Sequence, residues 1–146
     1  LLSGAMDAAL TAQQLRKTGS TVRIFTSEWS FTSDIINFGG SSVEESLAFV
    51  TYDPNSRASA HQAFLMNFEK RFGYKPSFAA VLAYESAKFL AAGLQRNSQR
   101  DGLKAALLQV GTLEGLQGTI RMGRYGDAER DTFLGSVRNG QFITLQ

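Results

Sequence analysis

The acidic residue whose place in the sequence most favours a role in binding is Glu28. It lies in the polar turn Ser27-Glu28-Trp29-Ser30, directly after a run that predicts a strand. Ligands of open α/β sheets bind at the carboxyl ends of strands, so a carboxylate at this place can meet a bound molecule. Position alone nevertheless favours a solvated turn carboxylate. Trp29, the sole tryptophan, could equally line a ligand cleft or cover the core, because its position does not distinguish the two roles.

The residues needed for catalysis or metal binding are not grouped in the sequence. The single histidine, His61, has no neighbouring carboxylate in sequence to orient it, so we expect a solvated helix residue rather than the base of a triad. One histidine and no cysteine leave only scattered carboxylates as metal ligands. Adjacent helical residues such as Glu44 and Glu45 point apart. We therefore expect no enzymatic activity, no metal and no cofactor.

The composition indicates a globular chain without the concentration of basic residues that nucleic-acid binding requires. The 146 residues are 43% hydrophobic, which is enough to bury a core. The 15 Lys and Arg residues are scattered and nearly balanced by 13 Asp and Glu, so no nucleic-acid partner is expected. No apolar run approaches the roughly 20 residues that cross a bilayer. The absence of cysteine fits either redox compartment.

The expected elements alternate between strands and helices. Apolar runs predict strands at residues 1–3, 22–25, 47–51 and 119–122, and a hairpin of 132–137 with 142–145 around Asn139-Gly140. Capping residues and apolar spacing predict helices at 7–17, 32–38 and 77–95, between Ser98 and Gly111, and through a phenylalanine stripe ending at Gly73. This order indicates an α/β protein with largely parallel sheets.

A series of short motifs runs in order along nearly the whole chain. They are Leu2-Ser3-Gly4, Lys17-Thr18-Gly19, Ile24 to Trp29, Phe64 to Gly73, Pro76-Ser77, Ala83 to Ala87, Gly115 to Ile120, Gly126-Asp127 and Val137 to Phe142. Together they resemble the type I periplasmic solute-binding proteins of the branched-chain amino-acid ABC transporter family. Two departures are Glu85, where the family usually has Asp, and Ser46, where Gly is usual; we expect both to be structural.

The resemblance implies the type I periplasmic-binding-protein fold, with two Rossmann-like lobes of largely parallel sheets that close over a ligand. It implies that this chain is the C-terminal part. Residues 1–51 would belong to the second lobe and 52–130 to the first, while the strands of 131–146 return to the second. The half of the family's fold that supplies groups for the ligand's carboxylate would lie outside this chain. With incomplete sheets, the chain is expected to self-associate or to exchange elements with a second copy.

The resemblance also implies the function and the site. The protein would be the periplasmic or extracytoplasmic solute-binding component of an ABC importer, passing a branched-chain-like amino acid or related metabolite to a membrane permease. A sensor or regulatory domain of the same fold is the alternative. Glu28 would accept the ligand's ammonium. The other residues expected to face the ligand are Ser3, Gly4, Ala5, Met6 and Trp29, of which Ala5 and Met6 would shape the side-chain pocket.

Overall fold

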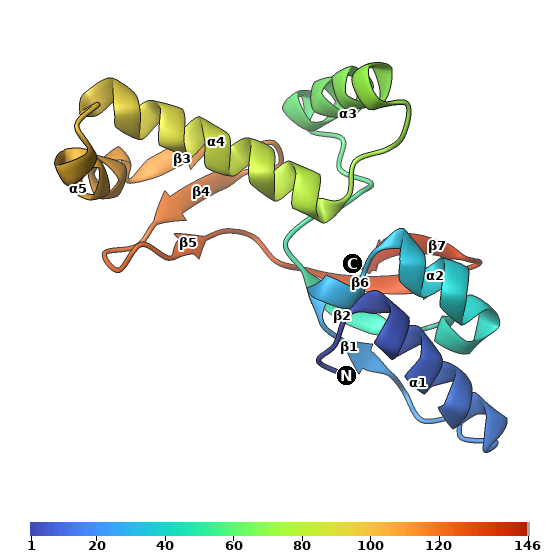
Figure 1. Cartoon of the computed structure of the whole chain (residues 1–146). Helices are drawn as coiled ribbons and strands as arrows, with labels where there is room; N and C mark the ends of the chain where they lie inside the picture. The colour runs from blue at the N-terminus through green and yellow to red at the C-terminus, as the bar shows by residue number, and fades with distance from the viewer. Residues whose placement is uncertain (146) are drawn as a thin grey trace. The chain divides into compact units, whose positions relative to one another are not determined.

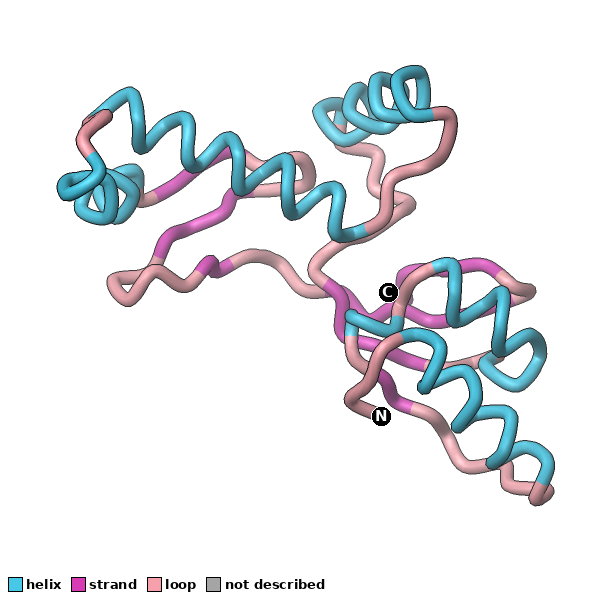
Figure 2. The backbone as a smooth tube through the Cα atoms, viewed as in Figure 1, coloured by secondary structure: helices cyan, strands magenta, loops and turns pink. Residues whose placement is uncertain are grey.

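A computed structural model describes residues 1–145, and the chain divides into two compact units. Unit 1 contains residues 1–55 and the segment from Thr132 onward, and unit 2 contains residues 56–131. Unit 2 is therefore an insertion in the chain of unit 1. Figure 1 follows the chain through both units, and Figure 2 shows their helices and strands.

Unit 1 consists of one mixed sheet and the helices that pack on it. The sheet has the order β1-β2-β6-β7, in which β1 runs parallel to β2 and the other two pairs are antiparallel. Its elements are α1 (Ala5–Lys17), β1 (Phe25–Thr26), the 3₁₀ turn η1 (Glu28–Ser30), α2 (Ser33–Gly39), the 3₁₀ turn η2 (Gly40–Val43), β2 (Leu47–Val50), β6 (Phe133–Arg138) and β7 (Gln141–Leu145).

The core of unit 1 forms where small residues let α1 pack closely. Ala8, Ala9 and Ala12 occupy one face of α1 and are at most 1% exposed. They pack with Ile35 of α2 and Val137 of β6. Alanine faces permit close approach of backbones, while the larger side chains come from the sheet and from α2. The core thus fixes the entry of α1 beside the carboxyl end of β1.

The hairpin of β6 and β7 is closed by a turn in the left-handed region. Asn139 and Gly140 have φ values of 52° and 65°, which is the type I′ pattern predicted for Asn-Gly. The Glu44 carboxylate accepts hydrogen bonds from the backbone N–H groups of Asn139 at 3.0 Å and Gly140 at 2.7 Å. The predicted hairpin is confirmed, and a distant carboxylate stabilises its turn.

Unit 2 is a helical layer with a small antiparallel sheet. The sheet has the order β3-β4-β5. The Phe64 ring of α3 contacts the Tyr84 ring of α4 at 4.9 Å between centroids, and α4 packs against α5 where Gly93 faces Leu107. The elements are α3 (Ser59–Phe72), α4 (Phe78–Arg96), α5 (Arg100–Val110), β3 (Thr112–Glu114), β4 (Thr119–Met122) and β5 (Ala128–Glu129).

Three sequence expectations are wrong in detail. The sheets are not largely parallel: β1 with β2 is the only parallel pair among the described strands, because β6 runs antiparallel to β2 and then turns back as a hairpin. The first predicted strand is absent, although the Leu1 carbonyl accepts a hydrogen bond from Ser27 N at 3.1 Å. His61 is fully buried rather than solvated, and its Nδ1 lies 3.0 Å from the Ser56 carbonyl oxygen.

We predict that Gly140→Ala destabilises unit 1 by about 1–2 kcal/mol, because an L-residue with a side chain pays that cost in the left-handed region. Thermal melting of the two proteins measures the change. Asn139→Gly is the matched control in the same turn and should melt like the parent, because glycine readily adopts the observed φ of 52°. Equal melting temperatures for Gly140→Ala and the parent would contradict the prediction.

Candidate functional site

The carboxyl end of β1 is held by a cluster of hydroxyl groups. Thr26 Oγ1 donates to Ser30 Oγ at 2.5 Å, and Ser30 Oγ donates to the Ser3 carbonyl at 2.8 Å. Ser27 Oγ is 3.3 Å from the same carbonyl. Thr26 and Ser30 are buried, at 7% and 0% exposed. These bonds tie the turn η1 to the segment that leads into α1, so the positions of Glu28 and Gly4 are fixed relative to each other.

The Glu28 carboxylate links the carboxyl ends of the two parallel strands β1 and β2. Glu28 follows β1, and Thr51 directly follows β2. Glu28 Oε1 accepts hydrogen bonds from Thr51 N at 2.6 Å and from Thr51 Oγ1 at 2.9 Å, and Oε2 lies 3.2 Å from Thr51 Oγ1. Both residues are half-buried. A carboxylate can accept about four hydrogen bonds, so Oε2 keeps capacity for a further donor.

An open hollow of about 420 Å³ lies beside this turn. Leu2 and Trp29 are among its lining residues and are 94% and 75% exposed. The other lining residues are Ser3, Gly4 and Ser27. The hollow therefore combines large apolar side chains with backbone near the amino end of α1.

The structure brings some of the expected site residues together and separates others. Ser3, Gly4 and Trp29 line the hollow, and Glu28 lies in the same turn as Trp29. Ala5 packs partly against the core, and Met6 is 52% exposed and is not among the residues that line the hollow. Their expected role in shaping a pocket stays a prediction.

Thr51 is the residue at this site that the sequence analysis missed. The sequence predicted it as the last residue of the strand 47–51, and the rule that singled out Glu28 applies to the carboxyl end of that strand as well. The pairing of β1 with β2 in parallel, Thr26 opposite Ala48, brings the two strand ends together. A sequence prediction of which strands are neighbours would have been needed to find it.

Tyr52 is the titratable group beside Thr51, and it is buried. Burial, and next the negative charge of Asp53, raise the pKa of Tyr52 from 10.0 to about 12. The phenol is therefore neutral over the physiological range.

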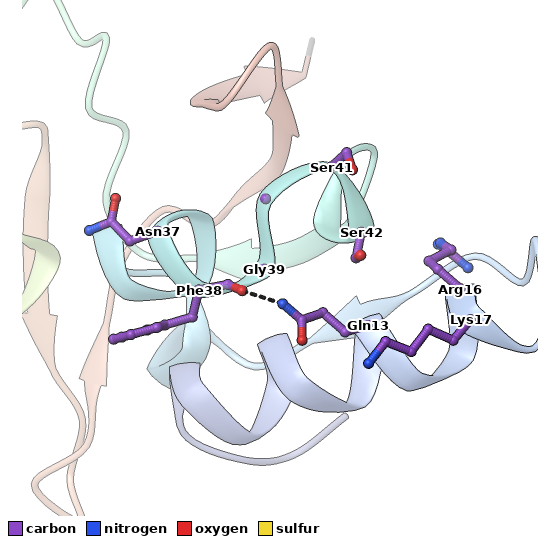
Figure 3. Close-up of a pocket in the computed structure, with 9 residues that line it drawn as sticks. Gln13, Arg16, Lys17, Asn37, Phe38, Gly39, Ser41 and Ser42 are labelled. Atoms are coloured by element: carbon purple, nitrogen blue, oxygen red, sulfur yellow. Dashed lines mark hydrogen bonds between the residues drawn. The ribbon is translucent and has the colours of Figure 1, made fainter.

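A second hollow of about 530 Å³ lies between the last turns of α1 and the α2–η2 junction (Figure 3). Gln13 Nε2 donates to the Phe38 carbonyl at 2.6 Å across it. Arg16 lines it but uses its guanidinium to bind the Ser20 and Val22 carbonyls, each at 3.0 Å. Gln13 and Arg16 thus join α1 to neighbouring segments of unit 1.

Within residues 1–145, no group of His, Asp and Glu side chains is arranged to hold a metal ion, and no helix is both long and apolar enough to cross a membrane. The candidate site consists of the hydroxyl cluster, the Glu28 carboxylate and the apolar hollow.

Comparison with known families accounts for nearly the whole chain. Residues 1–141 match the family model described as periplasmic binding protein. The chain belongs to that family. Its fold is the type I periplasmic-binding-protein fold, as the sequence motifs indicated, with mixed rather than largely parallel sheets in the described residues.

Solved structures of the family share the fold at low sequence identity. A leucine-binding protein from Thermotoga maritima is 22% identical, with a TM-score of 0.90 over 99% of this chain and 42% of that chain. A branched-chain amino-acid binding protein from Streptococcus pneumoniae, in complex with isoleucine, is 16% identical, with a TM-score of 0.86 over 99% and 43%. The chain thus spans less than half the length of these relatives. No curated protein matches it.

One further structure of the family holds a different kind of molecule. A solute-binding protein from R. palustris in complex with benzoate is 16% identical, with a TM-score of 0.79 over 94% of this chain and 39% of that chain. Benzoate carries no amine, so the fold alone does not define the ligand.

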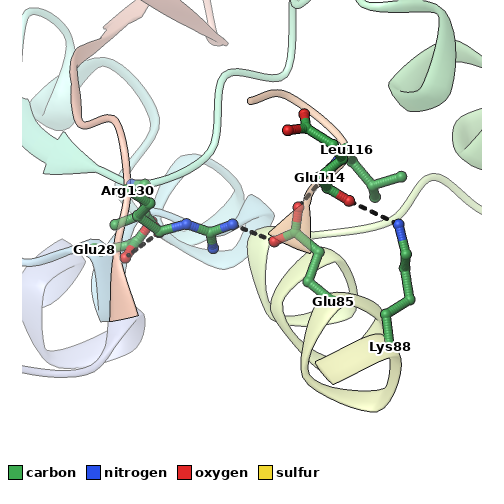
Figure 4. A network of polar contacts seen from close by, with 7 residues as sticks. Glu28, Glu85, Lys88, Glu114, Leu116 and Arg130 are labelled. Atoms are coloured by element: carbon green, nitrogen blue, oxygen red, sulfur yellow. Dashed lines mark hydrogen bonds and ion pairs between the residues drawn. The ribbon is translucent and has the colours of Figure 1, made fainter. Parts of the chain in front are cut away.

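The unusual Glu85 of this periplasmic binding protein is a buried structural carboxylate (Figure 4). It lies on α4 and is 3% exposed. It pairs with Arg130 and accepts a hydrogen bond from Leu116 N at 2.7 Å. The Gly115 backbone lies so close that a Cβ there would come within 2.6 Å of Glu85 Oε1. Glu85 therefore joins α4 to the β3–β4 turn and to the end of unit 2.

We predict that Arg130→Met destabilises unit 2 by about 3–5 kcal/mol, because it leaves the buried Glu85 charge without its partner. Denaturant unfolding measures the loss. The exposed pair of Arg121 and Glu129, 3.7 Å apart with side chains 67% and 63% exposed, provides the control. Arg121→Met should cost about 1 kcal/mol or less. Similar losses in the two variants would show that burial of the Glu85 pair does not matter.

Proposed function

We propose that the chain is part of the solute-binding component of an ABC importer and binds a small ligand without chemical conversion. The observation that carries the proposal is the Glu28 carboxylate, fixed at the carboxyl end of β1 in a turn whose neighbouring residues Ser27 and Trp29 line a partly apolar hollow. In open α/β folds this is where ligands bind. An ammonium needs a charged partner when it leaves water, and Glu28 Oε2 can supply it.

The ligand that fits best is an amino acid with an apolar side chain. Glu28 would accept its ammonium, while Ser3, Gly4, Ala5, Met6 and Trp29 would surround the rest of the molecule. Two of the related structures are named for leucine binding or contain isoleucine, which supports this assignment. Another relative was solved with benzoate, which carries no amine. The experiment must therefore test whether the ligand's amine contributes to binding.

The wider setting follows from the same proposal. Unit 1 would be part of the second lobe of the family's fold and unit 2 part of the first, with the final strands returning to the second lobe. The whole protein would lie outside the cytoplasm and deliver its ligand to a membrane permease. Ligand binding would stabilise one conformation of the two lobes, which the permease recognises.

We predict that Glu28→Gln in the whole protein weakens leucine binding by about 10- to 100-fold. Gln keeps the size of the side chain but removes a charge-assisted hydrogen bond worth about 1.5–3 kcal/mol. Titration calorimetry with leucine, isoleucine and valine measures the affinities. Glu45→Gln, an exposed position of the same unit, is the matched control and should leave them unchanged. Unchanged affinity in Glu28→Gln would reduce Glu28 to a turn residue.

A further inference from the structure

We propose that Thr51 is a positioning residue for ligand binding, because it holds the Glu28 carboxylate with one oxygen directed to the ligand. This inference rests on the proposed function. It adds a residue that follows β2 to a site that the sequence analysis built from the turn after β1 and the segment leading into α1. Thr51 itself is not proposed to touch the ligand.

The hydrogen bonds of Thr51 distinguish the two carboxylate oxygens of Glu28. Both short bonds, 2.6 Å from N and 2.9 Å from Oγ1, end on Oε1. The contact of Oγ1 with Oε2 is longer, at 3.2 Å. One hydroxyl hydrogen cannot serve both oxygens fully, so Oε1 is the better satisfied of the two. Oε2 therefore has the larger unused capacity to accept a donor.

The charge of Glu28 is not neutralised within its own unit. No Lys or Arg side chain in the described part of unit 1 forms an ion pair with it. Its donors are a neutral amide and a neutral hydroxyl. Glu28 thus has no cationic partner in its own unit, whereas Glu85 is already paired with Arg130.

Thr51 can position Glu28 because its own backbone is fixed. It follows Val50, which pairs with Phe133 in the centre of the sheet. A free glutamate side chain samples several rotamers and loses that freedom on binding, which lowers affinity. Two bonds from a rigid strand end remove this cost in advance, as in other preorganised sites.

The test uses the whole protein, with leucine and its deaminated analogue 4-methylpentanoate as probes. Thr51→Val keeps the shape and the backbone N–H but removes the hydroxyl. We expect leucine to bind about 3- to 10-fold more weakly, a loss typical of one hydrogen bond, while the affinity for 4-methylpentanoate stays constant. Thr51→Ser restores the hydroxyl and should recover most of the leucine affinity.

Thr119→Val is the matched control, because Thr119 Oγ1 also donates to a glutamate, Glu114, at 3.0 Å on the surface of unit 2. It should change neither affinity. Equal losses for leucine and 4-methylpentanoate in Thr51→Val, or no loss for either, would overturn the inference. If Glu28→Gln weakens leucine and Thr51→Val does not, only the role of Thr51 falls. If the parent does not bind leucine, or Glu28→Gln binds it normally, both proposals fall.

Discussion

The ladder between β2 and β6 is the interaction on which the candidate site depends. It pairs Leu47–Val50 with residues 133–136, from which β2 is separated in the chain by the whole of unit 2. Closing a long loop costs entropy that rises only slowly with its length, so a short ladder between two strands can hold such an insertion. Because β2 lies between β1 and β6, the same ladder fixes Thr51 and, through it, Glu28.

The segments that join the two units are anchored within each unit. Asp53 accepts a hydrogen bond from Thr144 Oγ1 at 2.5 Å in unit 1. The Ser56 carbonyl meets Gln62 Nε2 at 2.7 Å at the start of unit 2, and Arg130 pairs with Glu85 at its end. In each unit, polar contacts thus hold the segments where the chain enters or leaves it. Such contacts let an inserted unit keep a definite fold.

The features that the sequence could predict are those set by the backbone preferences of a few neighbouring residues. The Asn139-Gly140 hairpin and the end of α3 at Gly73, where φ is 77°, follow from backbone preferences of those residues. Strands β3 and β5 were missed because they are two or three residues long and form only by pairing with β4. Glu28 could be put forward as a candidate from its place after β1, but recognising Thr51 beside it required knowledge of which strands are neighbours.

Glu28, Glu44 and Glu85 each accept a hydrogen bond from the backbone, but their remaining partners differ. Each carboxylate accepts a hydrogen bond from a backbone N–H that is distant in sequence: Thr51, Gly140 and Leu116 respectively. Glu44 divides two N–H groups between its oxygens, and Glu85 adds an arginine, so both are explained by the structure alone. Glu28 has its donors concentrated on Oε1 and no cation from its own unit. A carboxylate in this state gains most from an added ammonium, which is the physical reason why we propose Glu28, rather than either of the other two, as the ligand's partner.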